Sequence, residues 1–584
     1  MRIEVDLTTI PRRIVHADLK IPAAPGPLTL YYPKWMPGDH GPTGPIDNLA
    51  GIFFRAGGKD LAWTRGPEDM YVFKVVVPEG AGEVDVALDY LMPPEPEGNP
   101  EGASASEKLA IFNWSHVLLM PSPRGDDVMV EADLKAPEGW TVMPVLEKKP
   151  VSLTTLIDSP VLAGKFTKTI ALDPHVFVDL AADAPADLAM PETMITALKK
   201  LVRETDAVFA PRPFKDYHFL VALSSQVSRF SVEHQASSDN RFRERTLIDD
   251  DMRRVAADTL SHEYVHAWNG KYRRPAGLRP GDFETPIDSS LLWVYEGLSQ
   301  YYGWVLAARS GELKKDEALD TLAVTAAEQE TRAGRRWRDL VDTGRSAQLL
   351  YYSPDAWTSW RRATDFYDEG ALLWLDVDVA IRKLTKGTRT LDDFCRRFFA
   401  GAVPMPPVKT YEIGDVIVAL NAVALNDWAA FLDARVHAHG EHAPLGGVEG
   451  AGWTLAWAEK PSPLMEATAT VSEVVDLRYS IGLVVETSGT IADVIPDSPA
   501  WKAGLAPGMK IVAVDERRFT KEGIDDAVRA GKDAAATIAF LVENADYFRT
   551  IRVETRGGAR FPVLSRAKGS DLLEAILAPR ARTP

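Results

Sequence analysis

The chain has very little cysteine: Cys395 is the single one among 584 residues. No disulfide can therefore form within the chain, and no cysteine-based zinc knuckle can be assembled. We expect Cys395 to be a small buried core residue, because free cysteine commonly behaves as a small buried hydrophobe.

Long apolar runs are also missing, so the sequence predicts no integral membrane segment. The N-terminal stretch "MRIEVDLTTIPRRIVHADLKIP" alternates polar and apolar residues and has no continuous apolar segment of the signal-peptide type. We expect a soluble protein. A signal already removed would leave the same pattern, so a cytoplasmic location and a periplasmic or secreted mature form both stay open.

An excess of basic residues is absent as well. The formal net charge is -17 and the sequence pI is near 5.2, which argues against a nucleic-acid partner and against binding to anionic membranes. Hydrophobic residues make up 46% of the chain and charged residues 26%, which is a globular composition. The chain is long enough for several domains.

The pattern of apolar residues changes twice along the chain. Up to about residue 175, short alternating runs such as "MYVFKVVV" predict strands. Helical spacing follows, after which the chain becomes β-rich again. We predict a multidomain α+β fold with four parts: a β-sandwich-like domain at 1–175, a mainly helical domain with a small sheet at 176–460, a PDZ-like domain at 478–558 and a C-terminal tail at 559–584.

The PDZ-like assignment rests on the order of elements. The strand pattern "SIGLVVE" is followed by a Ser-Pro-Ala helix start, by "AGLAPG", by the strand "KIVAVD" and by the helix "KEGIDDAVRAG". This order resembles a PDZ domain. Such a domain would bind a peptide terminus as an extra strand beside "SIGLVV", or it would dock on the rest of the chain. The sequence does not choose between these two roles.

The strongest chemical motif is His-Glu-x-x-His in "TLSHEYVHAWNG", at His262, Glu263 and His266. Histidines four apart on a helix point to the same side, so their imidazoles can share one metal ion. The glutamate beside the first histidine is then placed to take a proton from water at the metal.

A solvated helix face with two histidines is the alternative interpretation. The flanking Leu260, Val265 and Trp268 argue against it, because they predict a largely buried helix. Burying two histidines and a glutamate is costly unless a partner satisfies them. We therefore favour a zinc site.

A catalytic zinc ion needs a third protein ligand and an open position for water. Glu296 is the best candidate, because it is a carboxylate in the otherwise apolar, aromatic stretch "LLWVYEGLSQYYG". Glu284 is a weaker candidate because it lies in the Pro/Gly-rich stretch "RPGDFETP". The set His262, His266 and Glu296 leaves a fourth position for water.

Together, "SHEYVHAWNGKYRRP" and "LLWVYEGLSQYYG" resemble the glycyl aminopeptidase family of zinc metallopeptidases, relatives of the thermolysin-like and aminopeptidase N-like gluzincins. The early "YYPKWMPGDHGPTGP" is similar to the N-terminal β-domain of that family, and the PDZ-like segment lies where the family has its PDZ domain. The resemblance implies a thermolysin-like catalytic domain and one zinc ion.

Two further site residues follow from the resemblance. Tyr367 matches the tyrosine of a Tyr-x-x-Gly element and would donate a hydrogen bond to the oxyanion. Glu233, in "RFSVEHQASS", matches a glutamate that binds the α-ammonium of the substrate, as charge-assisted hydrogen bonding would allow. A packed aromatic at a helix start and a surface glutamate on an edge strand are the alternative interpretations.

The resemblance implies hydrolysis of the N-terminal peptide bond of peptides with a free N-terminus and a preference for glycine and alanine. A zinc endopeptidase of the same fold is one alternative. The other is a PDZ-mediated peptide-binding protein with a relic metal site, although the complete set of ligands and base argues against a relic.

Overall fold

A computed structural model describes residues 1–94, 101–144, 150–209, 211–351 and 356–581. Within these residues no helix is long and apolar enough to cross a membrane. The chain forms two compact units, each assembled from separate segments. The first unit comprises Met1–Asp249, Thr259–Asp288 and Phe399–Glu412, and the second comprises Asp250–Asp258, Ser289–Phe398 and Ile413–Pro584.

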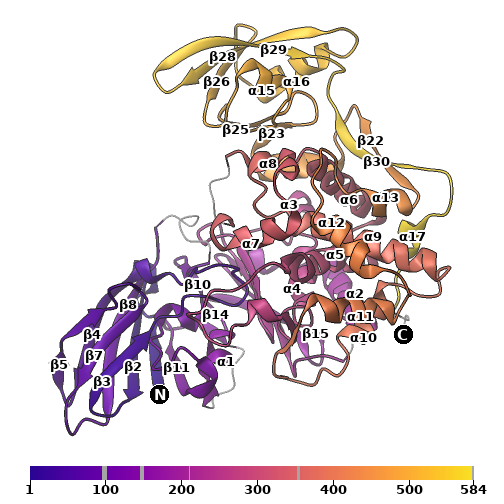
Figure 1. Cartoon of the computed structure of the whole chain (residues 1–584). Coiled ribbons are helices and arrows are strands. Elements are labelled where there is room, and N and C mark those ends of the chain that lie inside the picture. Colours follow the sequence, from indigo (N-terminus) through magenta and orange to yellow (C-terminus); the bar gives the residue numbers. More distant parts are fainter. Residues whose placement is uncertain (95–100, 145–149, 210, 352–355, 582–584) are drawn as a thin grey trace. The chain divides into compact units, whose positions relative to one another are not determined.

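The N-terminal part of the first unit is made of β-sheets (Figure 1, indigo and purple). Its largest sheet has the strand order β13-β11-β1-β2-β8-β4-β5. The strands of this sheet are β1 (Arg2–Asp6), β2 (Ile14–Pro22), β4 (Leu49–Ala56), β5 (Lys59–Leu61), β8 (Glu83–Leu91), β11 (Met129–Lys135) and β13 (Val151–Ser152). In β2, Val15, Ala17, Leu19 and Ile21 are buried while the residues between them are not, so the alternation predicted from the sequence marks the core face.

Two smaller sheets complete this β-rich region, with strand orders β3-β7-β6 and β12-β14-β10-β9. Their strands are β3 (Gly26–Tyr31), β6 (Trp63–Arg65), β7 (Val72–Val77), β9 (Ser104–Ala105), β10 (Leu109–Phe112), β12 (Thr141–Pro144) and β14 (Val161–Gly164). A short helix, α1 (Leu153–Ile157), precedes β14, with its first turn capped by the Ser152 side chain.

The rest of the first unit contains a five-stranded sheet of order β15-β16-β17-β19-β18. Its strands are β15 (Phe166–Asp173), β16 (Val176–Ala182), β17 (Tyr217–Leu223), β18 (Phe230–Glu233) and β19 (Ser237–Phe242). The three central strands run parallel, and the edge strands β15 and β18 run antiparallel to their neighbours. Helices α2 (Glu192–Phe209) and α4 (Thr259–Val265) belong to the same unit. The small sheet beside helices is thus present.

Helices dominate the second unit (Figure 1, pink and orange). They include α3 (Asp250–Val255), α5 (Leu292–Ser310), α6 (Lys315–Glu330), α7 (Leu340–Leu350), α8 (Thr358–Arg361), α9 (Asp368–Leu384), α10 (Leu391–Phe398), α11 (Ile413–Asn421), α12 (Trp428–Val436), α13 (Gly446–Gly450) and α14 (Pro463–Val471). Helix α5 is buried on nearly all sides, as its aromatic and apolar sequence requires. Cys395 in α10 is free and buried, as expected.

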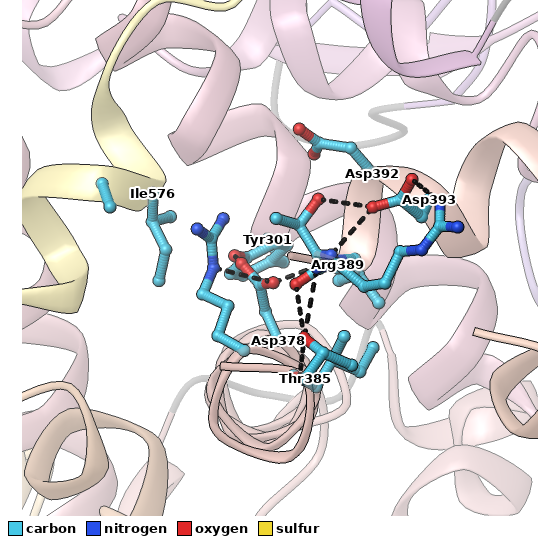
Figure 2. Close-up of polar contacts among 12 residues, drawn as sticks. Tyr301, Asp378, Thr385, Arg389, Asp392, Asp393 and Ile576 are labelled. Atoms are coloured by element: carbon cyan, nitrogen blue, oxygen red, sulfur yellow. Dashed lines mark hydrogen bonds and ion pairs between the residues drawn. The ribbon is translucent and has the colours of Figure 1, made fainter. Parts of the chain in front are cut away.

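A buried polar network fixes α5 to its neighbours. Figure 2 shows Tyr301 of α5 directed at Asp378 of α9, to which its hydroxyl donates a 2.8 Å hydrogen bond. Asp378 also accepts the backbone N–H of Leu391 at 2.8 Å. Arg309, at the C-terminal end of α5, donates to the carbonyl of Ile576 in α17 (Leu572–Leu577) at 2.9 Å. Buried polar groups that are paired in this way hold one packing arrangement.

The C-terminal part of the second unit is β-rich. Its strands are β22 (Trp453–Ala458), β23 (Val474–Leu477), β24 (Leu483–Glu486), β25 (Ile491–Val494), β26 (Lys510–Val514), β27 (Arg517–Arg518), β28 (Ala536–Asn544), β29 (Tyr547–Thr555) and β30 (Phe561–Arg566). Helices α15 (Pro499–Ala503) and α16 (Lys521–Ala530) have the places expected from the PDZ-like sequence order. Beyond residue 558, β30 pairs with β22. The predicted multidomain α+β fold is confirmed.

Candidate active site

Helix α4 carries the first half of the His-Glu-x-x-His motif and ends at Val265. His266 therefore lies in the turn that follows the helix, one residue after its last helical residue. The Nε2 atoms of His262 and His266 nevertheless face each other at 2.9 Å. The convergence expected from their spacing is present in the first unit.

The motif is buried, with exposed fractions of 8% for His262, 6% for Glu263 and 1% for His266. The solvated helix face is therefore wrong. Nδ1 of His266 lies 2.9 Å from the carbonyl oxygen of Asn269. A carbonyl can only accept, so it holds the proton on Nδ1 and leaves the Nε2 lone pair directed at His262. Such hydrogen bonds typically orient metal-binding histidines.

An aromatic cluster supports the motif from behind. Tyr264 lies between Tyr217 and Trp268, with ring centroids 4.8 and 5.4 Å away. Phe214 contacts Tyr264 and Trp268 as well. The Tyr217 hydroxyl donates to the carbonyl of Glu263 at 3.3 Å. Packed rings with fixed contacts keep the backbone of the motif in place.

Glu233 ends β18 and lies near the motif. Potential ligand atoms of three buried residues lie within 4.8 Å of one another, one atom each from Glu233, Glu263 and His266. Glu233 has an exposed fraction of only 3% although β18 is an edge strand, so it is not a surface glutamate. Two buried carboxylates beside a histidine favour a cation as their partner.

A loop of the N-terminal β-rich region covers Glu233. A Cβ atom on Gly38 would lie 3.2 Å from both carboxylate oxygens, and Gly38 has a φ of +107°. Both facts favour glycine at this position. Burial raises the pKa of the neighbouring Asp39 to about 6, and the negative charge of Glu233 adds to the rise, while the hydrogen bond from Thr43 opposes it. Glu233 and Asp39 are therefore close enough to interact electrostatically.

Asp158 joins the segment that follows the motif to the segment that follows Glu233. Asp158 accepts a 2.8 Å hydrogen bond from Nζ of Lys271, which follows the motif, and lies 3.2 Å from Nδ1 of His234, which follows Glu233. Although burial by itself would raise it, the charges and hydrogen bonds of Lys271 and His234 hold the pKa of Asp158 well below its usual range. Sequence reasoning missed Asp158 and Lys271, because no motif marks them.

Glu296 and Tyr367 belong to the second unit. Glu296 lies on α5 with an exposed fraction of 2%, which matches its prediction as a buried carboxylate on an apolar helix. Tyr367 immediately precedes α9, and its hydroxyl lies 3.1 Å from that of Tyr351. The ligand role of Glu296 and the oxyanion role of Tyr367 stay predictions.

The glycine of the Tyr-x-x-Gly element has a packing reason. A Cβ atom on Gly370 would lie 2.7 Å from the Cα atom of Gly297, which directly follows Glu296. Helices α5 and α9 therefore cross at two glycines, with backbone against backbone. This crossing fixes the positions of Glu296 and Tyr367 within the second unit. Glu369, next to Gly370, is buried and forms ion pairs with Arg335 and Arg362.

We expect Gly370→Ala to lower the free energy of unfolding by about 1–3 kcal/mol, because a methyl group at this crossing forces the two backbones apart. Chemical denaturation measures the change. Gly414→Ala is the matched control, since a Cβ atom at Gly414 of α11 meets nothing within 4 Å. Equal stability changes in the two variants would contradict this explanation of the crossing.

Comparison with known proteins identifies the domains. Residues 255–373 match the M61 glycyl aminopeptidase model, residues 2–165 match the M61 N-terminal domain, and residues 490–543 match a PDZ domain. The chain carries the domains of an M61 peptidase. These domains make it an enzyme, a metallo-aminopeptidase by class, and the predicted family resemblance is confirmed.

Solved structures agree with the M61 fold. An aminopeptidase N family protein from Idiomarina loihiensis has a TM-score of 0.80 and 18% identity, and the match covers 99% of this chain and 100% of that chain. An M1 zinc metallopeptidase from Deinococcus radiodurans has a TM-score of 0.43 and 14% identity, over 76% of this chain and 94% of that one. No curated protein matches this chain.

Proposed function

We propose that the chain is a zinc-dependent aminopeptidase that hydrolyses the N-terminal peptide bond of peptides with a free α-ammonium group. The observation that carries this proposal is the buried group formed by Glu233, Glu263 and His266 around the facing nitrogens of the two histidines. It combines a proposed metal ligand, the proposed base and a second buried carboxylate.

The donor set fits zinc. Zinc is commonly bound by histidine nitrogens at about 2.0–2.1 Å and by carboxylate oxygens at similar distances. Nε2 atoms 2.9 Å apart, with the His266 proton held on Nδ1, can both reach one such ion. We propose His262, His266 and Glu296 as the three ligands. Bound there, zinc would polarise the scissile carbonyl and lower the pKa of the attacking water.

The protein side chains would carry the remaining work. Glu263 accepts the proton of the attacking water and returns it to the nitrogen of the leaving amine. Tyr367 donates a hydrogen bond to the carbonyl oxygen as negative charge develops on it. Glu233 holds the α-ammonium group, so that the first peptide bond of the substrate is the one placed for cleavage. The two buried carboxylates of Glu233 and Glu263 support a cation at this position.

The M61 glycyl aminopeptidase match favours glycine as the N-terminal residue that is removed, and we propose the similarly small alanine as a second one. Metal analysis of the purified chain, combined with glycine and alanine p-nitroanilide substrates, tests both parts of the proposal. We expect one zinc ion per chain and release of nitroaniline that a chelator abolishes. A chain that binds no zinc and releases no nitroaniline would support the peptide-binding alternative instead.

We expect Tyr367→Phe to lower kcat by about 10²–10³-fold with little change in KM, as the loss of one oxyanion donor typically does. Steady-state kinetics on alanine p-nitroanilide measure the change. Tyr351→Phe is the matched control, because it removes the hydroxyl that lies 3.1 Å from that of Tyr367 but leaves the donor itself. A kcat for Tyr367→Phe close to that of the wild type would rule out the oxyanion role.

A further inference from the structure

The strand at which a PDZ domain takes up a peptide is already paired on both sides. PDZ domains bind an extended peptide as an added strand at an open sheet edge. Here β24 pairs on one side with β25 and on the other with β23, which precedes it in the chain. Strand β23 runs antiparallel to β24, with Val474 opposite Glu486 and Leu477 opposite Leu483. Within the described residues, β24 therefore offers no open edge.

The turn between β23 and β24 forms a cradle of backbone amides. The N–H groups of Ser480, Ile481 and Gly482 all donate to the carbonyl oxygen of Leu477, each at 3.1 Å. Successive amides that converge in this way make a site for an anion, and such nests capture the C-terminal carboxylate of a peptide. A carbonyl oxygen has two lone pairs for three donors, so a carboxylate would satisfy the cradle better.

The side chains of β23 alternate as those of a bound peptide do. Val475 and Leu477 have exposed fractions of 5% and 2%, and they join the apolar core of the PDZ domain. That core includes Leu483 of β24 and Ile524 of α16. Val474, on the other face of β23, is only partly buried.

Contacts at the end of β23 join it to the helical part of the second unit. Arg478 donates to Asp476 at 3.0 Å and to Glu328 of α6 at 2.9 Å. Burial by itself would lower the pKa of Arg478, but the two carboxylates raise it. Tyr479 packs on Trp457 of β22, with ring centroids 5.3 Å apart. The segment that directly follows β23 is thus bound to α6 and β22, while β23 itself pairs with β24.

We propose that β23 is an internal ligand of the PDZ domain. Residues 474–477 fill the groove as an apolar C-terminal peptide would, and the Leu477 carbonyl occupies the position of the terminal carboxylate. The PDZ domain is thereby docked on the helical part of the enzyme through β23. It accepts an external peptide with an apolar C-terminal residue and a free carboxylate only when β23 leaves. This proposal does not depend on the proposed catalytic chemistry.

The test uses the full chain and a fluorescein-labelled peptide of sequence EVVDL, which copies residues 473–477 and ends in a free carboxylate. The label blocks the α-amine, so the peptide is no aminopeptidase substrate. Val475→Asp places a charge in the core and should release β23. Val474→Asp makes the same change on the opposite face and is the matched control. Fluorescence anisotropy measures binding, and hydrogen exchange measures the protection of the β24 amides.

We expect neither the wild type nor Val474→Asp to bind the peptide measurably, and we expect slow exchange of the β24 amides in both. Val475→Asp should bind the peptide at least about tenfold more tightly than either of them. An amidated peptide should bind Val475→Asp more weakly than the free acid. If Val475→Asp fails to fold, Glu328→Gln provides a second test. This variant removes one of the two carboxylate charges that hold Arg478, and it should also raise peptide binding.

Two outcomes would overturn the proposal. The first is an open groove in the wild type, shown either by peptide binding as tight as that of Val475→Asp or by fast exchange of the wild-type β24 amides. A Val475→Asp chain that exchanges quickly across β24 and still binds no peptide shows that the groove is not a peptide site. Neither outcome depends on hydrolysis, so the aminopeptidase proposal stands or falls separately.

Discussion

Glu263→Gln should leave zinc bound and lower kcat by about 10²–10⁴-fold, because an amide cannot take a proton from the attacking water. The size of the side chain is preserved, so packing in α4 should change little. Steady-state kinetics on alanine p-nitroanilide measure the loss, and metal analysis of the same preparation shows that the ion is retained.

The control for this variant is Tyr264→Phe, which alters the neighbouring buried residue but keeps its ring packed between Tyr217 and Trp268. We expect Tyr264→Phe to retain activity near that of the wild type. If Glu263→Gln turns over substrate as fast as Tyr264→Phe does, the general-base assignment of Glu263 is wrong.

Glu296→Gln should weaken zinc binding by about 100-fold or more, since even residues that merely orient a ligand contribute 10- to 100-fold to metal affinity. Activity should fall with zinc occupancy and return in part at high added zinc. Competition with a chromogenic chelator measures the affinity. A buried glutamine in place of the carboxylate would also leave the metal site with less negative charge.

Ser299→Ala on the same helix separates loss of the ligand from disturbance of α5. The Ser299 hydroxyl donates within the helix, to the carbonyl of Tyr295 at 2.9 Å. We expect Ser299→Ala to bind zinc as the wild type does. Unchanged zinc affinity in Glu296→Gln would remove Glu296 from the ligand set and reopen the choice of third ligand.

The convergence of the two histidines could be predicted from the sequence because it depends on local spacing. His266 lies four positions after His262, and this spacing brings their nitrogens together even though α4 ends at Val265. Local patterning also predicted Cys395 as a core residue and Glu296 as a carboxylate on a buried helix.

The surroundings of the motif could not be predicted, because they depend on contacts between distant segments. Gly38 covers Glu233 from the N-terminal β-rich region, and Lys271 reaches Asp158. The packing reason for Gly370 appears only where α9 meets α5. In the PDZ domain, the sequence predicted a possible docking strand beside "SIGLVV", but the pairing of β23 with β24 is a matter of strand register.

The central proposal is that Glu233 restricts the enzyme to substrates with a free N-terminus, and one measurement tests it most directly. The wild type and Glu233→Gln are each assayed on matched peptides that begin with glycine or alanine. The N-terminus of each peptide is either free or acetylated. We expect the wild type to cleave only the free peptides, and Glu233→Gln to raise their KM by about 10- to 100-fold, the worth of a charge-assisted hydrogen bond. Equal cleavage of free and acetylated peptides by the wild type would contradict the account and favour an endopeptidase.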